Sequence, residues 1–202
     1  MAKVVLIAGL SGSGKTTLAR GLCEADDAVY IGIDHYYHGF EDVPLARRQL
    51  LNFDAPDSIE HNRLIEDVAK LKQGFPALRP TYDHAAFARL PVPRLLEPRQ
   101  LVVVEGMFAL YWTDLRAFAD CSVFVDTDPE TCLRRRLHRD LNVFKRSPED
   151  ALLRYHSHVK PNQERYVLPG RELSDLQLDG EKDVAELMNT VRQHLARTGA
   201  TG

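Results

Sequence analysis

The chain carries the stretch Gly9-Leu10-Ser11-Gly12-Ser13-Gly14-Lys15-Thr16, which matches the phosphate-binding loop pattern G-x-x-x-x-G-K-[ST] at every fixed position. The apolar run Val4–Ala8 precedes it, and helix-forming residues follow from Thr17 onward. The sequence therefore predicts a strand, a glycine-rich turn and the first turn of a helix. In such a turn, backbone N–H groups and the helix dipole favour phosphate. A glycine-rich turn that contains a lysine by coincidence is the alternative.

Several residues of this loop have a predicted role in holding a nucleoside triphosphate. Lys15 is expected to reach the β- and γ-phosphates, and the hydroxyl of Thr16 is expected to hold Mg²⁺. The ATP-binding set predicted from the loop is Gly9, Ser11, Gly12, Ser13, Gly14, Lys15, Thr16 and Thr17. ATP and Mg²⁺ are the predicted cofactors.

The composition favours one α/β domain, and we expect residues 1–202 to form it. The 26 Lys and Arg against 29 Asp and Glu argue against a nucleic acid or membrane partner. No apolar run is long enough to cross a bilayer, and no leader is expected because Met1 runs directly into the first strand. Because Cys23, Cys121 and Cys132 lack zinc-ligand spacing, buried reduced thiols in a cytoplasmic protein are expected.

Short apolar runs alternate with amphipathic stretches, which is typical of a mostly parallel sheet with helices on both faces. Together with the loop, this predicts the three-layer α/β fold of P-loop NTPases. The predicted strands are Val4–Ala8, Val29–Ile33, Leu101–Glu105, Ser122–Asp126 and Leu176–Leu178, and the predicted helices are Lys15–Cys23, Glu60–Gln73, Thr113–Ala119, Pro129–Asp140, Pro148–Val167 and Glu181–Ala196. Residues 75–98 contain five prolines and are expected to form a small hairpin that stands off the sheet.

Carboxylates at strand ends are candidate catalytic groups, because a parallel sheet binds ligands at the carboxyl ends of its strands. Asp34 ends the second apolar run, and a right-handed crossover is expected to return the chain beside the first strand. Its carboxylate is therefore expected near the phosphate loop; a cap or turn aspartate is the alternative. Glu105 ends the third strong run and is a candidate to orient Mg²⁺ directly or through water. Asp128, followed by Pro129, is expected to cap a helix.

A dense group of cations lies in the second half of the chain. It comprises Arg134, Arg135, Arg136, Arg139, Lys145 and Arg146, with Asp140 as the single acid. On a helix, positions 135 and 139 share one face. Phosphoryl transfer needs cations around the γ-phosphate, so residues 129–147 are predicted to form an arginine-rich lid. An ordinary solvated helix face is the alternative.

Seven motifs occur in the order seen in uridine-cytidine kinases, which belong to the phosphoribulokinase-like superfamily of P-loop kinases. They are the phosphate loop, Asp34–Tyr37, Asn52–Asp57, Pro80–Asp83, Glu105–Gly106, Arg135–Asp140 and Val159–Pro161. The chain resembles that family from Val4 to about Leu178.

The resemblance implies roles for individual residues. Asp34 resembles the catalytic base that takes the proton of the 5′-hydroxyl, with Lys15 and Arg139 completing the catalytic set. Asp54 and Arg136 resemble the residues that hold the ribose hydroxyls. Arg139 and Arg146 resemble lid residues and join the implied ATP-binding set. The implied substrate-binding set is Asp34, Tyr37, Phe53, Asp54, Tyr82, His84, Phe87, Arg136 and Arg154. A homo-oligomer is also implied, since relatives often assemble.

Three positions depart from the family pattern. Phe87 stands where the family has a histidine that contacts the pyrimidine, Arg154 where a glutamine reaches the base, and Phe144 where a lid arginine stands. His84 is a candidate to compensate in part. An ion pair with Asp150 is the alternative role for Arg154.

The sequence predicts an ATP-dependent kinase that phosphorylates the 5′-hydroxyl of uridine or cytidine, a step of pyrimidine salvage. A kinase of the same fold that acts on another nucleoside, a sugar phosphate or a pantothenate-like acid is the nearest alternative, which Phe87 and Arg154 favour. A nucleotide-dependent switch is disfavoured because the sequence has no Asn-Lys-x-Asp or Asp-x-x-Gly motif. A non-catalytic sensor does not need both Lys15 and Asp34.

Overall fold

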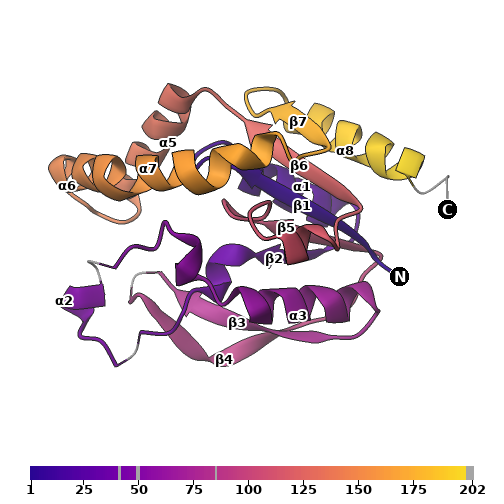
Figure 1. Ribbon diagram of the computed structural model, residues 1–202, viewed down its shortest axis with the longest axis horizontal. Coiled ribbons are helices and arrows are strands. Elements are labelled where there is room, and N and C mark those ends of the chain that lie inside the picture. The colour runs from indigo at the N-terminus through magenta and orange to yellow at the C-terminus, as the bar shows by residue number, and fades with distance from the viewer. Residues whose placement is uncertain (41, 49–50, 85, 199–202) are drawn as a thin grey trace.

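A five-stranded parallel sheet forms the centre of the molecule (Figure 1), in a computed structural model that describes residues 1–40, 42–48, 51–84 and 86–198. The domain predicted over residues 1–202 and the hairpin predicted over 75–98 therefore include a few positions outside these ranges. The strands stand in the order β2-β5-β1-β6-β7. Their bounds are β1 Lys3–Gly9, β2 Val29–Gly32, β5 Leu101–Glu105, β6 Cys121–Asp126 and β7 Leu176–Asp179.

Helices cover both faces of this sheet, as predicted. Their bounds are α1 Lys15–Ala25, α2 Leu45–Arg48, α3 His61–Lys72, α4 Thr113–Arg116, α5 Pro129–Asn142, α6 Pro148–Arg154, α7 Lys160–Asn162 and α8 Val184–Thr198. In β1, Val4 and Leu6 join the core that α3 covers, whereas Val5 and Ile7 join the core that α1 and α8 cover. This alternation follows from the two-residue period of a strand and divides the molecule into three layers.

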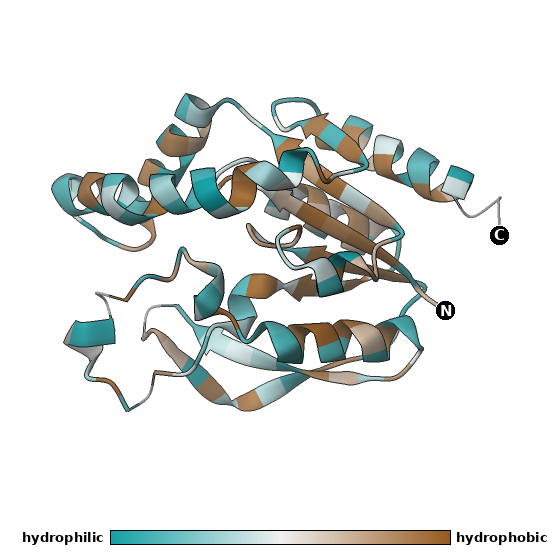
Figure 2. Cartoon of the chain, in the orientation of Figure 1, coloured by the Kyte–Doolittle hydropathy of each residue, from teal (hydrophilic) through white to brown (hydrophobic). Residues whose placement is uncertain are grey.

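Apolar residues concentrate in the central strands, while the outer helices carry polar residues (Figure 2). Cys121 and Cys132 are buried free thiols, as expected, whereas Cys23 is only half-buried. Within the described ranges, no helix is long and apolar enough to span a membrane.

A separate two-stranded antiparallel sheet is formed by β3 (Ala77–Asp83) and β4 (Ala88–Leu96), where the sequence predicts a hairpin. Figure 1 shows this pair below the main sheet, beside α3. Its register shifts between Arg79 and Thr81. Pro80 lies at the shift and has no N–H to donate to a partner strand, which explains the irregularity there.

The position of β2 corrects one prediction. This strand pairs with β5, so β5 lies between β2 and β1 and the chain does not return beside the strand it left. The strand Leu101–Glu105 is buried along its whole length, and the centre of the sheet is where such a strand loses most contact with water. In addition, β2 ends at Gly32, so Asp34 lies in a short 3₁₀ helix, Ile33–Tyr36, beyond the strand.

Two predicted helices differ from the structure. The single helix expected over Pro148–Val167 is helical without a break, but it contains wider π-helical turns at Tyr155–Val159 and Gln163–Val167. Pro161 explains the first of these turns, because its ring lacks an N–H and clashes with the carbonyl of Ser157, four residues earlier. The helix expected over Thr113–Ala119 ends at Arg116, after which the backbone tightens into three-residue turns.

Candidate active site

The phosphate loop connects β1 to α1 and is shaped by glycine. Gly12 and Gly14 have φ values of 92° and 98°, and a Cβ on Gly12 would lie 2.5 Å from the carbonyl oxygen of Cys132. The hydroxyl of Thr127 donates to the Ser13 carbonyl oxygen at 2.8 Å. The Ser13 hydroxyl itself is buried and has no hydrogen-bond partner among the described residues. A tight cradle with an orphaned hydroxyl fits phosphate oxygens.

Glu105 connects the phosphate loop to β2. Its Oε1 accepts a hydrogen bond of 3.0 Å from the Thr16 hydroxyl and lies 4.0 Å from Nζ of Lys15, while its Oε2 accepts one of 2.8 Å from the Tyr30 hydroxyl. Burial raises the pKa of Glu105 and lowers the pKa of Lys15. A hydroxyl and a carboxylate that converge are the hard oxygen donors that Mg²⁺ prefers, so Thr16 and Glu105 fit the predicted metal.

A pocket of about 220 Å³ opens from this group. Fifteen predicted site residues line it: Ser11, Lys15, Thr16, Asp34, Tyr37, Phe53, Asp54, Tyr82, His84, Phe87, Glu105, Arg136, Arg139, Arg146 and Arg154. The remaining predicted residues, Gly9, Gly12, Ser13, Gly14 and Thr17, belong to the loop and to the start of α1 and do not line it. Asp34 is exposed, so its carboxylate is accessible to a ligand despite the unexpected strand order.

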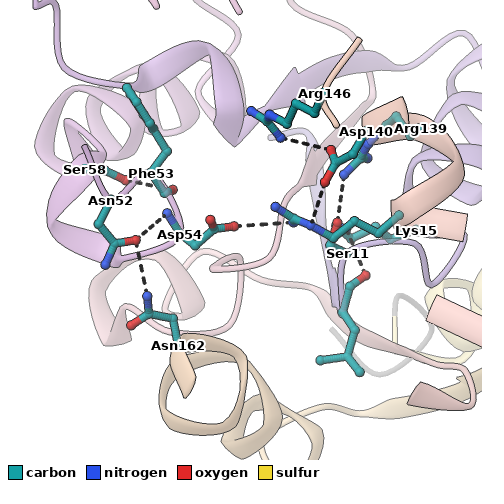
Figure 3. A network of polar contacts seen from close by, with 12 residues as sticks. Ser11, Lys15, Asn52, Phe53, Asp54, Ser58, Arg139, Asp140, Arg146 and Asn162 are labelled. Atoms are coloured by element: carbon teal, nitrogen blue, oxygen red, sulfur yellow. Dashed lines mark hydrogen bonds and ion pairs between the residues drawn. The ribbon is translucent and has the colours of Figure 1, made fainter. Parts of the chain in front are cut away.

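A chain of charged contacts crosses the pocket from Asp54 to Arg146 (Figure 3). Arg136 Nη1 lies 3.5 Å from Asp54 Oδ1, and Arg136 Nε lies 3.6 Å from Asp140 Oδ2. Arg146 Nη1 lies 3.0 Å from Asp140 Oδ1. Asp140 is 1% exposed, so a buried carboxylate holds two arginines of the pocket in place.

The arginines of α5 also contact the phosphate loop. Arg139 donates to the Ser11 hydroxyl at 2.9 Å, and Arg135 donates to the Gly12 carbonyl oxygen at 3.2 Å. The ring of Phe144 lies 6.0 Å from the Arg139 guanidinium and 5.2 Å from that of Arg146. Phe144, which replaces an arginine of the family pattern, therefore supports two other arginines by cation–π contact.

Aromatic rings form the other end of the pocket. Tyr37 lies edge-on to Phe53 at 5.2 Å between ring centroids and 5.3 Å from Tyr82. Phe87 lies 5.3 Å from Phe53 with the two planes inclined by 34°. His84 packs on Tyr82 at 5.2 Å. This cluster presents flat, apolar surface suited to a planar ring.

Arg154 both pairs with Asp150 and lines the pocket. Its Nε lies 3.4 Å from a carboxylate oxygen of Asp150, one helical turn earlier, and the same side chain lines the pocket. The ion pair therefore does not remove Arg154 from the pocket.

Several residues that line the pocket were not predicted from the sequence as site residues: Leu51, Asn52, Met107, Asp140, Phe144 and His158. Asn52 Oδ1 accepts hydrogen bonds from the Asp54 N–H at 3.1 Å and from Asn162 at 3.3 Å, which orients the loop that carries Asp54. Asp140 could have been predicted as a partner of Arg136 because it follows Arg136 by four residues, which places both on one face of a helix.

This chain is similar to a described family of kinases and to individual kinases of several organisms. Residues 4–185 match the family described as "Phosphoribulokinase / Uridine kinase family". A uridine kinase from Chloroflexus aggregans is 34% identical over 180 residues, 88% of this chain and 86% of that protein. A uridine kinase from Staphylococcus aureus strain JH9 is 32% identical over 198 residues, which are 95% of this chain and 96% of that protein.

A solved phosphoribulokinase from Rhodobacter spheroides shares the fold, with a TM-score of 0.63, 15% identity, and coverage of 90% of this chain and 73% of that one. The predicted P-loop kinase fold is thereby confirmed. This chain belongs to the phosphoribulokinase and uridine kinase family, whose members transfer a phosphoryl group to a hydroxyl.

Proposed function

We propose that this chain is an ATP-dependent kinase that phosphorylates the 5′-hydroxyl of a pyrimidine ribonucleoside, uridine or cytidine, in pyrimidine salvage. The observation that carries the proposal is the convergence of Lys15, Asp34 and the Asp54–Arg136 pair on one pocket. Relatives named uridine kinase over almost the whole chain support the same substrate class. We place the enzyme in the cytoplasm, acting on small molecules without nucleic acid or membrane partners, and include homo-oligomerisation in the proposal.

The phosphate loop holds the triphosphate in this proposal. Lys15 contributes positive charge to the phosphates, and Ser13 offers a hydroxyl that has no partner within the described part of the chain. Thr16 and Glu105 hold Mg²⁺, which neutralises charge that develops on the phosphates when it is bound. Phosphoryl transfer depends chiefly on positioning and charge neutralisation, and these residues provide both at the triphosphate.

Asp34 serves as the base at the acceptor end. It lines the pocket, and it lies close enough to Lys15 for its charge to offset part of the lowering that burial causes in the pKa of that amine. Asp54 accepts hydrogen bonds from the ribose hydroxyls while Arg136 holds its carboxylate in position. The hydroxyl proton passes to the Asp34 carboxylate as the hydroxyl oxygen bonds to the γ-phosphorus of ATP, and the bond from that phosphorus to the bridging oxygen breaks, which releases ADP.

Residues 129–147 act as a lid. Arg139 reaches the phosphate loop through Ser11, and Arg146 is held by Asp140. Closure of such a segment excludes water and adds positive charge around the transferred group.

A second candidate function is phosphorylation of another hydroxylated metabolite, and the base end of the pocket favours it. Phe87 packs on Phe53 and offers no hydrogen bond where a histidine is expected, while Arg154 adds a cation. A polar edge of the base left unmatched in a closed pocket weakens discrimination by more than the ~1 kcal/mol of an ordinary hydrogen bond.

The test is ADP release from ATP and Mg²⁺ with a panel of acceptors: uridine, cytidine, other ribonucleosides, deoxynucleosides, sugar phosphates and pantothenate. Turnover on uridine or cytidine that Asp34→Asn removes supports the proposal. Turnover confined to another acceptor selects the second candidate, and ATP binding without turnover on any acceptor contradicts both.

A further inference from the structure

Three arginines line a groove outside the catalytic pocket, between β2 and the hairpin. Arg79 of β3 and Arg94 of β4 are directly opposite each other in the hairpin register. Directly opposite residues of an antiparallel pair point to the same face. Arg99 lines the same groove, which measures about 320 Å³, and Glu97 is the single acid among the described residues that line it.

Arg79 is unusual because it is buried and no carboxylate among the described residues is found to compensate its positive charge. It is 4% exposed, and its Nε is buried with no hydrogen-bond partner among the described residues. Burial is the main cause that lowers the pKa of Arg79, and Arg94 lowers it further. No carboxylate is among the described groups that act on this pKa. The guanidinium nevertheless stays charged, since its ordinary pKa exceeds 12.

A buried cation without a counter-charge destabilises a fold, and like charges directly opposite in a hairpin add to the cost. A bound anion would remove both penalties at once. The groove holds the volume of several water molecules at ~30 Å³ each, which is ample for an oxyanion or a small phosphorylated molecule.

We infer that this groove is a second anion site, which binds a phosphate group as free inorganic phosphate or as the phosphomonoester of a small metabolite. Arg79 supplies buried donors and Arg94 supplies exposed ones, and the forked guanidinium geometry matches phosphate oxygens. Arg99 forms the rim, where a 3.5 Å contact with the exposed Asp27 holds it near the groove.

The groove also shares a side chain with the candidate metal site. Tyr30 lines the groove, and its hydroxyl donates to Glu105 Oε2 at 2.8 Å. An anion seated against Tyr30 therefore acts on the orientation of the carboxylate proposed to hold Mg²⁺. This inference concerns a site separate from the catalytic pocket and does not depend on which acceptor the kinase uses.

Calorimetric titration of the full chain with inorganic phosphate tests the site. Because the phosphate loop also binds this ion, the titration is repeated in Lys15→Ala, where binding at the groove is expected to remain. Adding Arg79→Met to that variant is expected to weaken the remaining binding at least tenfold, and adding Arg94→Ala to weaken it severalfold. Arg197→Ala, at an exposed position on α8, is the charge-matched control and is expected to leave the remaining phosphate binding unchanged.

Thermal unfolding provides a second readout. Phosphate is expected to raise the Tm of Lys15→Ala but not that of its Arg79→Met form, whose Tm in phosphate-free buffer is no lower. Tighter binding of ribose 5-phosphate than of inorganic phosphate assigns the site to a metabolite, and the reverse assigns it to the free ion. Phosphate binding that Lys15→Ala abolishes, or that survives both arginine replacements unchanged, would overturn the inference. If the Arg79→Met form does not fold, the Arg94→Ala replacement, at an exposed position, tests the inference by its effect on phosphate binding.

Discussion

The hydroxyl of Tyr30 donates a 2.8 Å hydrogen bond to Oε2 of Glu105, the carboxylate whose other oxygen accepts from Thr16. Replacement Tyr30→Phe removes the donor that orients this carboxylate while keeping the ring. A hydrogen bond to a charged group contributes ~1.5–3 kcal/mol, so the Mg²⁺ concentration for half-maximal rate should rise about tenfold or more. Steady-state rates across a Mg²⁺ titration measure this.

Tyr111→Phe is the matched control, because the Tyr111 side chain is 42% exposed and does not line the pocket. An unchanged Mg²⁺ requirement in Tyr30→Phe would show that Glu105 is oriented by other groups or does not hold the metal.

Asp34→Asn keeps the size of the side chain and removes its ability to take a proton. We expect kcat to fall by about 10²–10⁴, the usual contribution of a positioned base, with ATP binding preserved. Single-turnover rates and binding of a non-hydrolysable ATP analogue separate the two effects. Asp114→Asn, at an exposed position of α4, is the control. Near-normal turnover would remove Asp34 from the role of base.

Asp140→Ala tests the buried carboxylate shared by Arg136 and Arg146. Removing one partner leaves two arginines in a largely buried site without their counter-charge, and such a loss costs ~3–5 kcal/mol. We expect a lower free energy of unfolding by about that amount and a raised KM for the acceptor, because Arg136 also holds Asp54. Urea denaturation and initial rates measure both. Glu149→Ala, exposed at the start of α6, should change neither.

The parts of the site that could be predicted from the sequence are those with a local pattern. The phosphate loop is one, because its glycines, Lys15 and Thr16 are adjacent in the chain and act through their own backbone. The strand order could not be predicted. The pairing of β5 with both β1 and β2 depends on contacts between distant segments, which place this fully buried strand inside the sheet. Asp34 still reaches the pocket because the turn after β2 extends past Gly32.

The parts of the site that could not be predicted depend on contacts between distant segments of the chain. The Asp54–Arg136 pair joins residues 82 positions apart, and only the resemblance to a family suggested it. Neither the burial of Asp140 nor that of Arg79 follows from local sequence, because each depends on which element packs above it. A β4 residue, Arg94, faces Arg79 only through a register that shifts at Pro80.

His35 should make stability depend on pH. Burial, with a further contribution from Arg79, lowers the pKa of His35 from 6.5 to about 4. Between these values the unfolded chain binds a proton that the folded chain does not, so this contribution to stability is complete above pH 6.5 and is lost as pH falls toward 4. The limiting slope is ~1.4 kcal/mol per pH unit. Urea denaturation from pH 7 downward should show a smaller slope in His35→Gln and an unchanged one in His138→Gln.

Gly12→Ala tests the close approach of the phosphate loop to α5. Gly12 and Gly74 have similar φ values, 92° and 88°, but a Cβ on Gly12 meets the Cys132 carbonyl oxygen at 2.5 Å, whereas one on Gly74 meets nothing within 4 Å. Both alanine variants carry the same backbone strain of ~1–2 kcal/mol, so their difference isolates the clash. Gly74→Ala should bind an ATP analogue normally, while Gly12→Ala should bind at least tenfold more weakly in a calorimetric titration. Equal affinities would mean that the loop moves away from α5 without loss of phosphate binding.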